Sequence, residues 1–231
     1  MFSTRAFTFL QGLRAPDQLP QDVQVLVPYN DAQTLQYVQQ FLTRFYHDKC
    51  SRIGVFGINP GRLGAGLTGI AFTDPVALRE HCGIENTLGS TAELSSEFIY
   101  KVIDAYGGSS AFFAEFFLSS LCPLGFTKGT KNYNFYDDAA LQSAVIPFIR
   151  STMNEQMKLP LSPDTAVILG TGKIRVVAES LNASEKYFRN LVFLEHPRYI
   201  MQYKRRSVPA FVRKYVDTLH SLENAVTHST L

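Results

Sequence analysis

The chain has 231 residues, of which 45% are hydrophobic and 18% are charged, and its formal net charge is +2. This length can bury one sizeable core, and the composition is typical of a globular protein rather than a disordered or fibrous one. No apolar stretch is long enough to span a membrane, and the N-terminal residues lack the layout of a signal peptide, so we expect a cytoplasmic protein without a membrane partner.

Three cysteines, Cys50, Cys82 and Cys122, are widely spaced along the chain. An odd number at such spacing argues against a disulfide framework, a zinc site and a four-cysteine iron–sulfur cluster. We therefore expect reduced packing residues, and neither a metal nor another cofactor.

Residues 1–30 contain three prolines and show little periodicity, which predicts an irregular N-terminal arm. We expect residues 31–231 to form a single domain. That domain begins with apolar residues at helical spacing over 31–49, which predict a helix. The apolar run 52–58 follows and predicts a buried parallel strand.

A glycine-rich loop, 57–72, follows this strand and contains Asn59, Pro60 and Phe72. Glycine lets another backbone approach closely and Pro60 stiffens the turn, so the loop can wrap around a flat ligand. A carboxamide in a fixed position can hold a water molecule, and an aromatic face can stack on a base. The alternative is a plain connector in which Asn59 caps a turn.

Strands alternate with helices along the rest of the chain. An aspartate and a proline at 74–75 predict a short helix, residues 132–136 are interpreted as a loop, and 170–173 as a turn rather than a phosphate loop. Strands are predicted at 116–121, 165–169 and 191–194, and helices at 94–106, 137–157, 173–182 and 208–222. We expect Pro147 to kink or split the second of these helices. This order predicts an α/β protein, a three-layer α/β/α fold around a four-stranded parallel sheet.

Three polar residues stand where predicted strands end: Asn59, Ser120 and His196. Because the carboxyl ends of parallel strands meet at one rim, where ligands bind in open α/β sheets, we expect these side chains to share a site. A lone histidine is more often structural than catalytic. The convergence of three polar residues favours a functional role.

The segment after His196 combines positive charge with aromatic rings. Basic residues interleaved with aromatics suit phosphate neutralisation beside base stacking, which indicates a nucleic-acid partner. The alternative is a solvated helix face. The residues are Arg198, Lys204, Arg205, Arg206, Arg213 and Lys214, with Tyr199 and Tyr203 between them and Tyr215 directly after them.

These features resemble the uracil-DNA glycosylase superfamily, and specifically its single-strand-selective monofunctional branch. That branch has an Asn-Pro-Gly loop that continues to a Thr-Gly step and a phenylalanine, a Leu-Cys-Pro-Leu sequence after a middle strand, and a His-Pro step after the last strand. The resemblance covers residues 50–215. The matching residues are Asn59-Pro60-Gly61, Thr68-Gly69, Phe72, Leu121-Cys122-Pro123-Leu124 and His196-Pro197.

The resemblance implies a monofunctional enzyme that hydrolyses the bond between a flipped, deaminated base and its sugar. By that resemblance Asn59 would position the attacking water, Phe72 would stack on the base, and His196 would donate a hydrogen bond to the base carbonyl as negative charge develops there. The other residues expected around the base are Gly57, Ile58, Gly61, Gly69 and Ser120. Those expected on DNA are Arg198, Tyr199, Ile200, Met201, Lys204 and Arg205.

Tyr199, Ile200 and Met201 are the candidates for a wedge that fills the position vacated by the base. For Ile200 and Met201 the alternative is packing in the core. We expect the partner to be damaged DNA, single- or double-stranded, and the protein to be a monomer.

The chain also departs from the branch pattern. Ser120 stands where the branch has an asparagine that reads the uracil edge, Ala71 replaces a proline, and Arg198-Tyr199-Ile200 replaces Ser-Pro-Arg. A serine hydroxyl cannot read the edge with two hydrogen bonds, so another damaged base such as xanthine or hypoxanthine is an alternative substrate. A non-catalytic DNA-binding relative and an unrelated α/β enzyme acting on a nucleoside or nucleotide are further alternatives. The basic segment argues against the last.

Overall fold

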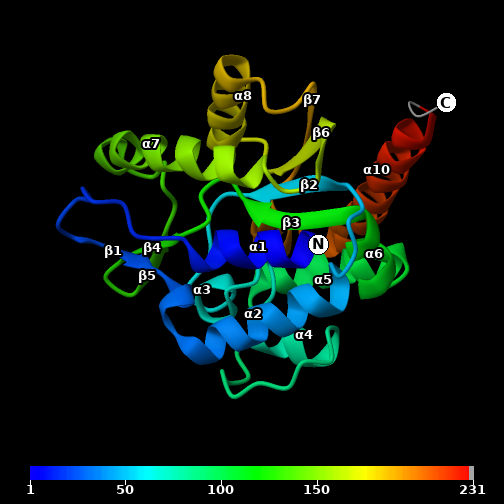
Figure 1. Cartoon of the computed structure of the whole chain (residues 1–231), viewed down its shortest axis with the longest axis horizontal. Helices are drawn as coiled ribbons and strands as arrows, with labels where there is room; N and C mark the ends of the chain where they lie inside the picture. Colours follow the sequence, from blue (N-terminus) through cyan, green and yellow to red (C-terminus); the bar gives the residue numbers. More distant parts are fainter. Residues whose placement is uncertain (229–231) are drawn as a thin grey trace.

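A four-stranded parallel sheet with strand order β3-β2-β6-β7 forms the centre of the molecule (Figure 1). The computed structural model describes residues 1–228, and the side chains of residues 1–223. Helices cover both faces of the sheet, so the predicted three-layer α/β/α fold is confirmed. The strands are β2 (Arg52–Gly57), β3 (Phe116–Ser120), β6 (Leu161–Leu169) and β7 (Asn190–Leu194).

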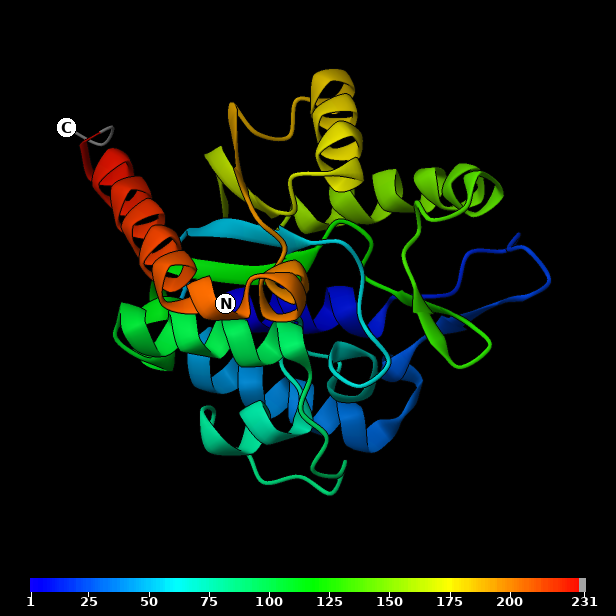
Figure 2. The ribbon, with the colours of Figure 1, turned by 180° about the vertical axis from the view of Figure 1, so that it is seen from behind.

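One helix layer contains α1, α7 and α8, and the opposite layer contains α5, α9 and α10 (Figures 1 and 2). The long helices are α1 (Phe2–Gln11), α2 (Ala32–Phe45), α5 (Leu94–Tyr106), α7 (Ala139–Gln156), α8 (Lys173–Glu185) and α10 (Val208–His228). The short ones are α3 (Ala65–Thr68), α4 (Pro75–Glu80), α6 (Ser109–Glu115), α9 (Pro197–Tyr203) and the 3₁₀ turns η1 (Pro28–Asn30) and η2 (Arg205–Ser207). In the described part of the chain, no helix combines the length and apolar character that crossing a bilayer requires.

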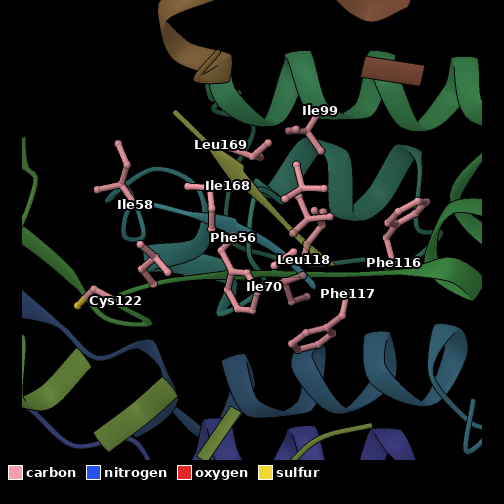
Figure 3. Packing of buried hydrophobic residues seen from close by; sticks show 14 of the residues in the cluster. Phe56, Ile58, Ile70, Ile99, Phe116, Phe117, Leu118, Cys122, Ile168 and Leu169 are labelled. Carbon is pink, nitrogen blue, oxygen red and sulfur yellow. The ribbon is translucent and has the colours of Figure 1, made fainter. Parts of the chain in front are cut away.

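Strands β2 and β3 are buried because both faces of the sheet are covered there, whereas β7 is only partly buried. All six residues of β2 are buried, the pattern expected of a parallel strand between two helix layers. On β3 the neighbouring rings of Phe116 and Phe117 point to opposite faces of the sheet (Figure 3). Phe117 packs against Phe2 of α1, and Phe116 packs against Tyr106 of α5. The side chains of this sheet therefore join the two layers into one core.

The first thirty residues are not the irregular arm that we predicted. Helix α1 packs into the core, where the ring of Phe2 stacks on Tyr46 at 5.1 Å and lies 5.2 Å from the guanidinium carbon of Arg52. Two of the three prolines lie between α1 and the next strand, and Pro28 begins η1. The prolines therefore lie in the connections after α1, and their presence does not argue against a helix at residues 2–11.

A second sheet, antiparallel with order β1-β4-β5, lies beside the main one and is absent from our prediction. Its strands are β1 (Val23–Leu26), β4 (Gly125–Lys128) and β5 (Lys131–Tyr133). The region interpreted as a loop, 132–136, therefore starts inside a strand. Strand β1 pairs with β4, so the N-terminal segment supports the chain that follows β3.

Other boundaries differ from the prediction for identifiable reasons. Strand β6 begins four residues earlier than predicted and contains Pro163, close to a shift in its register with β2. Helix α7 continues through Pro147. Helices α6 and α9 are too short for a periodic pattern to reveal. Cys82 and Cys122 are buried as expected, whereas Cys50 is exposed.

Replacing Phe2 with alanine tests whether α1 belongs to the core. Phe2 is fully buried between Tyr46 and Phe117, so Phe2→Ala should lower the free energy of unfolding by about 3–5 kcal/mol in a urea titration. Thr4→Ala, on the exposed side of the same helix, is the control and should change it by less than about 0.5 kcal/mol. Equal stabilities of the two variants would contradict the packing.

Candidate active site

Most of the residues predicted to act on a base line one small pocket, of about 70 Å³, at the carboxyl end of the sheet. Asn59 follows β2, Ser120 ends β3 and His196 follows β7. Strand β6 separates β2 from β7, so the ends of β2 and β7 are two strand spacings apart, about 10 Å. The pocket-lining residues from our prediction are Ile58, Asn59, Gly61, Phe72, Ser120, His196 and Arg198.

A larger groove, of about 1,120 Å³, lies between α1 and α7. None of the predicted site residues line this groove. We therefore assign the site to the smaller pocket, where the polar groups converge.

Asn59 is held by the backbone at the end of β5 and just after it. Its Nδ2 donates to the carbonyl of Tyr133 at 3.2 Å, and its Oδ1 accepts from the N–H of Phe135 at 3.2 Å. This pair of hydrogen bonds fixes the orientation of the carboxamide. Oδ1 keeps a second lone pair with which to bind a water molecule.

Phe72 has a φ of 54°, a conformation that costs energy for a residue with a bulky side chain. Its ring lies over Gly57, where a Cβ atom would overlap the ring. Gly57 therefore contributes by leaving room for Phe72. The centroid of the half-buried ring is 6.4 Å from that of the His196 imidazole, with 46° between the planes. A flat ligand on this ring would thus lie beside the imidazole.

The two serines at the end of β3 face different neighbours. The hydroxyl of Ser119 donates to Oε1 of Gln156 on α7 at 2.5 Å. Ser120 pairs with Gly57 in the sheet register and lines the pocket. Within the described part of the chain its hydroxyl makes no hydrogen bond, so it is available to a ligand.

His196 is the N-cap residue of α9, and its Nδ1 accepts a hydrogen bond from the backbone N–H of Arg198 at 3.2 Å. Burial lowers the pKa of His196 from 6.5 to about 4, and the positive charge of Arg198 acts in the same direction. The imidazole is therefore neutral at neutral pH. Because Nδ1 is the acceptor, the proton is on Nε2, which can donate to a ligand.

Three predicted contacts, Gly69, Ile200 and Met201, are buried in the fold and are not available to a base or to DNA. The carbonyl of Gly69 accepts from the hydroxyl of Tyr29 at 3.0 Å and the residue packs against α2, away from the pocket. Ile200 is fully buried and Met201 is 3% exposed, because they lie on the face of α9 that packs on α5. The wedge hypothesis is wrong for these two, and the alternative, core packing, is correct.

The other DNA-contact candidates are on the surface. Arg198, Tyr199, Lys204 and Arg205 are exposed, and the rings of Tyr199 and Tyr203 are 5.6 Å apart. Tyr199 and Lys204 line a groove that adjoins the pocket at His196 and includes the turn 170–173. Lys214, in contrast, pairs with Glu195 at 2.9 Å, so its charge is already compensated.

The pocket also contains polar residues that we did not predict: Glu93, Ser95, Asn132 and Asn134. Asn132 accepts a hydrogen bond from the N–H of Arg62 at 2.9 Å. Glu93 stands at the start of a helix, where an acidic residue is ordinarily interpreted as a cap. The asparagines lie in a segment without periodicity. The sequence therefore contains no signal that would separate these residues from ordinary caps and loops.

Residues 44–220 match the family model of the Uracil DNA glycosylase superfamily, and the chain belongs to that superfamily. Among solved structures, the chain is similar to the crystal structure of wild-type SMUG2 from Pedobacter heparinus, with 41% sequence identity and a TM-score of 0.93. The alignment covers 96% of this chain and 98% of that one. The resemblance to the single-strand-selective monofunctional branch is thereby confirmed. The comparison with curated proteins found no match.

The protonation state of His196 can be measured directly. In a ¹⁵N NMR titration, we expect a pKa of about 4 and, above it, the tautomer with the proton on Nε2. Arg198→Ala should raise this pKa by removing a positive charge, yet leave it below 6.5 because the imidazole stays buried. A histidine that is half protonated near pH 6.5 would contradict the assignment.

Proposed function

We propose that the protein is a cytoplasmic, monofunctional DNA glycosylase that hydrolyses the N-glycosidic bond of a deaminated base, with uracil as the first candidate. The observation that carries the proposal is the convergence of Asn59, Phe72 and a neutral His196 on one pocket. Membership of the superfamily supports the same class of reaction.

The three side chains suit three requirements of the reaction. A flipped base needs a flat surface, which the Phe72 ring offers. As the bond between C1′ and the base nitrogen breaks, negative charge grows on the base carbonyl, and the Nε2–H of His196 stabilises it more in the transition state than in the ground state. The sugar becomes positively charged at C1′, and a water held by Oδ1 of Asn59 attacks it.

The neutral state of His196 makes it a donor suited to this task. A neutral donor stabilises the leaving base as an anion without having to transfer its proton. Its Nδ1 is engaged by the Arg198 backbone, so the imidazole keeps one orientation while the base departs.

The surface beside the pocket suits DNA. Arg198, Lys204 and Arg205 can contact phosphates, and the exposed Tyr199 remains the candidate for the wedge. The turn 170–173 begins α8 and lies in the same groove, so its backbone N–H groups and Lys173 add positive potential there.

The choice of base depends on Ser120. Its short side chain with an unpaired hydroxyl offers one hydrogen bond and leaves more room than an asparagine would. That observation favours a second candidate substrate, the deaminated purine xanthine, for the same reaction.

Asn59→Ala tests the proposal. Removing the carboxamide should lower the single-turnover rate of excision by about 10²-fold or more, because the water loses its fixed position. The measurement uses the purified protein with a panel of oligonucleotides, each carrying one lesion, and detects abasic sites by alkaline cleavage. DNA binding should be retained.

The matched control is Asn182→Ala. Asn182 makes the same two-bond contact, to the N–H and carbonyl of Phe188 at 2.9 Å each, far from the pocket. It should lose comparable stability but no activity. Unchanged excision by the Asn59 variant, or an equal loss in both variants, would rule out the assigned role.

Replacing Lys204 and Arg205 with alanine tests the DNA surface. If each contacts one phosphate of a single strand, the slope of log affinity against log salt should fall by about 1.4, since each contact contributes about 0.7. Lys49→Ala, an exposed lysine before the amino end of β2, should leave the slope unchanged. An unaltered slope in the double variant would show that Lys204 and Arg205 do not contact the DNA phosphates.

A further inference from the structure

Glu93 is a carboxylate in the pocket that the fold does not use. It occupies the N-cap position of α5, but its side chain makes no capping hydrogen bond. Its backbone N–H donates to Asp74 at 2.7 Å, and Asp74 also caps α4 through the N–H of Ala77. Asp74 therefore supplies the local structural contacts, and the carboxylate of Glu93 is left for another role.

Two glycines of the loop after β2 leave the space that this carboxylate fills. A Cβ atom on Gly61 would lie 2.5 Å from Oε1 of Glu93, and one on Gly64 would overlap Oε2. The carboxylate thus lies against the loop that carries Asn59. Both residues line the same pocket of about 70 Å³.

The position is unfavourable for a charge. Burial raises the pKa of Glu93, the charge of Arg198 opposes this, and the nearby Asp74 raises the pKa further. In the described part of the chain the carboxylate makes neither a hydrogen bond nor a close ion pair. The side chain is half-buried, so the carboxylate loses part of its hydration without gaining a partner, and folding alone does not explain this residue.

The proposed hydrolysis requires a group of this kind. Water that attacks C1′ must release a proton, and a carboxamide such as that of Asn59 is not basic enough to take it. His196 already carries its proton on Nε2 and uses Nδ1 as an acceptor for the backbone. Among the described residues that line the pocket, Glu93 is the single carboxylate.

We propose that Glu93 is a further catalytic residue, the base that accepts the proton of the attacking water; this inference rests on the proposed glycosylase function. The bond between C1′ and the base nitrogen breaks and its electron pair leaves with the base. The water oxygen forms a bond to C1′, and one water proton moves to a carboxylate oxygen of Glu93. That proton later passes to solvent or to the departed base.

Glu93→Gln keeps the shape of the side chain and removes its basicity. Single-turnover excision of uracil from an oligonucleotide should slow about 10²-fold, while the affinity for DNA is unchanged. The melting temperature should stay the same or rise, because a half-buried carboxylate without a partner is removed.

The pH dependence separates a base from a structural group. Wild-type excision should be fastest above the raised pKa of Glu93 and fall as the pH drops through it, because protonation removes the base. The charged or titratable groups that face this carboxylate are Asp74 and Arg198, with His196 on the same pocket. In Glu93→Gln the acid limb due to Glu93 should disappear, and only the effect of His196 near pH 4 should remain.

The matched control is Glu97→Gln. Glu97 lies one turn further along α5, where it pairs with Lys101 at the surface, so neither the rate nor the pH profile should change. If Glu93→Gln folds poorly, Glu93→Ala with added formate provides a second test, since formate can restore a missing base but not a damaged fold. Wild-type protein that excises no base would overturn the proposed function itself. Active wild-type protein with an equally active Glu93→Gln variant, and an unchanged acid limb, would overturn the role of Glu93 alone.

Discussion

The carboxamide of Asn59 connects the loop after β2 with the small antiparallel sheet, and the geometry of the site depends on this connection. Asn59 bonds to the backbone of Tyr133 and Phe135, so the loop after β2 is fixed to the end of β5 and the residues just after it. Strand β5 belongs to the small sheet, whose edge strand β1 comes from the N-terminal region. The orientation of Asn59 therefore depends on residues far away in the sequence, and so does the position of the water that we propose it holds.

The parallel sheet and the helix caps supply the rest of the geometry. Strands β2, β3 and β7 end at one rim, which brings a carboxamide, a hydroxyl and an imidazole to one pocket. The cap of α9 holds the imidazole, and burial keeps it neutral with its proton on Nε2. Glycines 57, 61 and 64 leave room for the Phe72 ring and the Glu93 carboxylate. The site thus uses local features that each have a simple physical cause.

The sequence predicts the central sheet well because its strands are apolar runs bounded by helices, and the rim residues follow from the strand ends. The prediction fails where the outcome depends on contacts between elements that are distant in the sequence. Ile200 and Met201 stand in a basic, aromatic segment, and only the packing of α9 on α5 reveals that they are buried. The prolines in residues 1–30 led us to predict an irregular segment there. Helix α1 is part of the core because Phe2 packs on Tyr46, a contact that the sequence does not show. Glu93 looks like a helix cap until the side chain is located against two glycines.

A crystal structure with an oligonucleotide containing 2′-fluoro-2′-deoxyuridine tests the central claim most directly, because the fluorine disfavours positive charge at C1′ and preserves the bond. The account predicts that the uracil lies on the Phe72 ring, with a carbonyl oxygen within hydrogen-bond distance of Nε2 of His196 and a water on Oδ1 of Asn59. A base that remains stacked in the DNA, or that binds in the groove between α1 and α7, would contradict it.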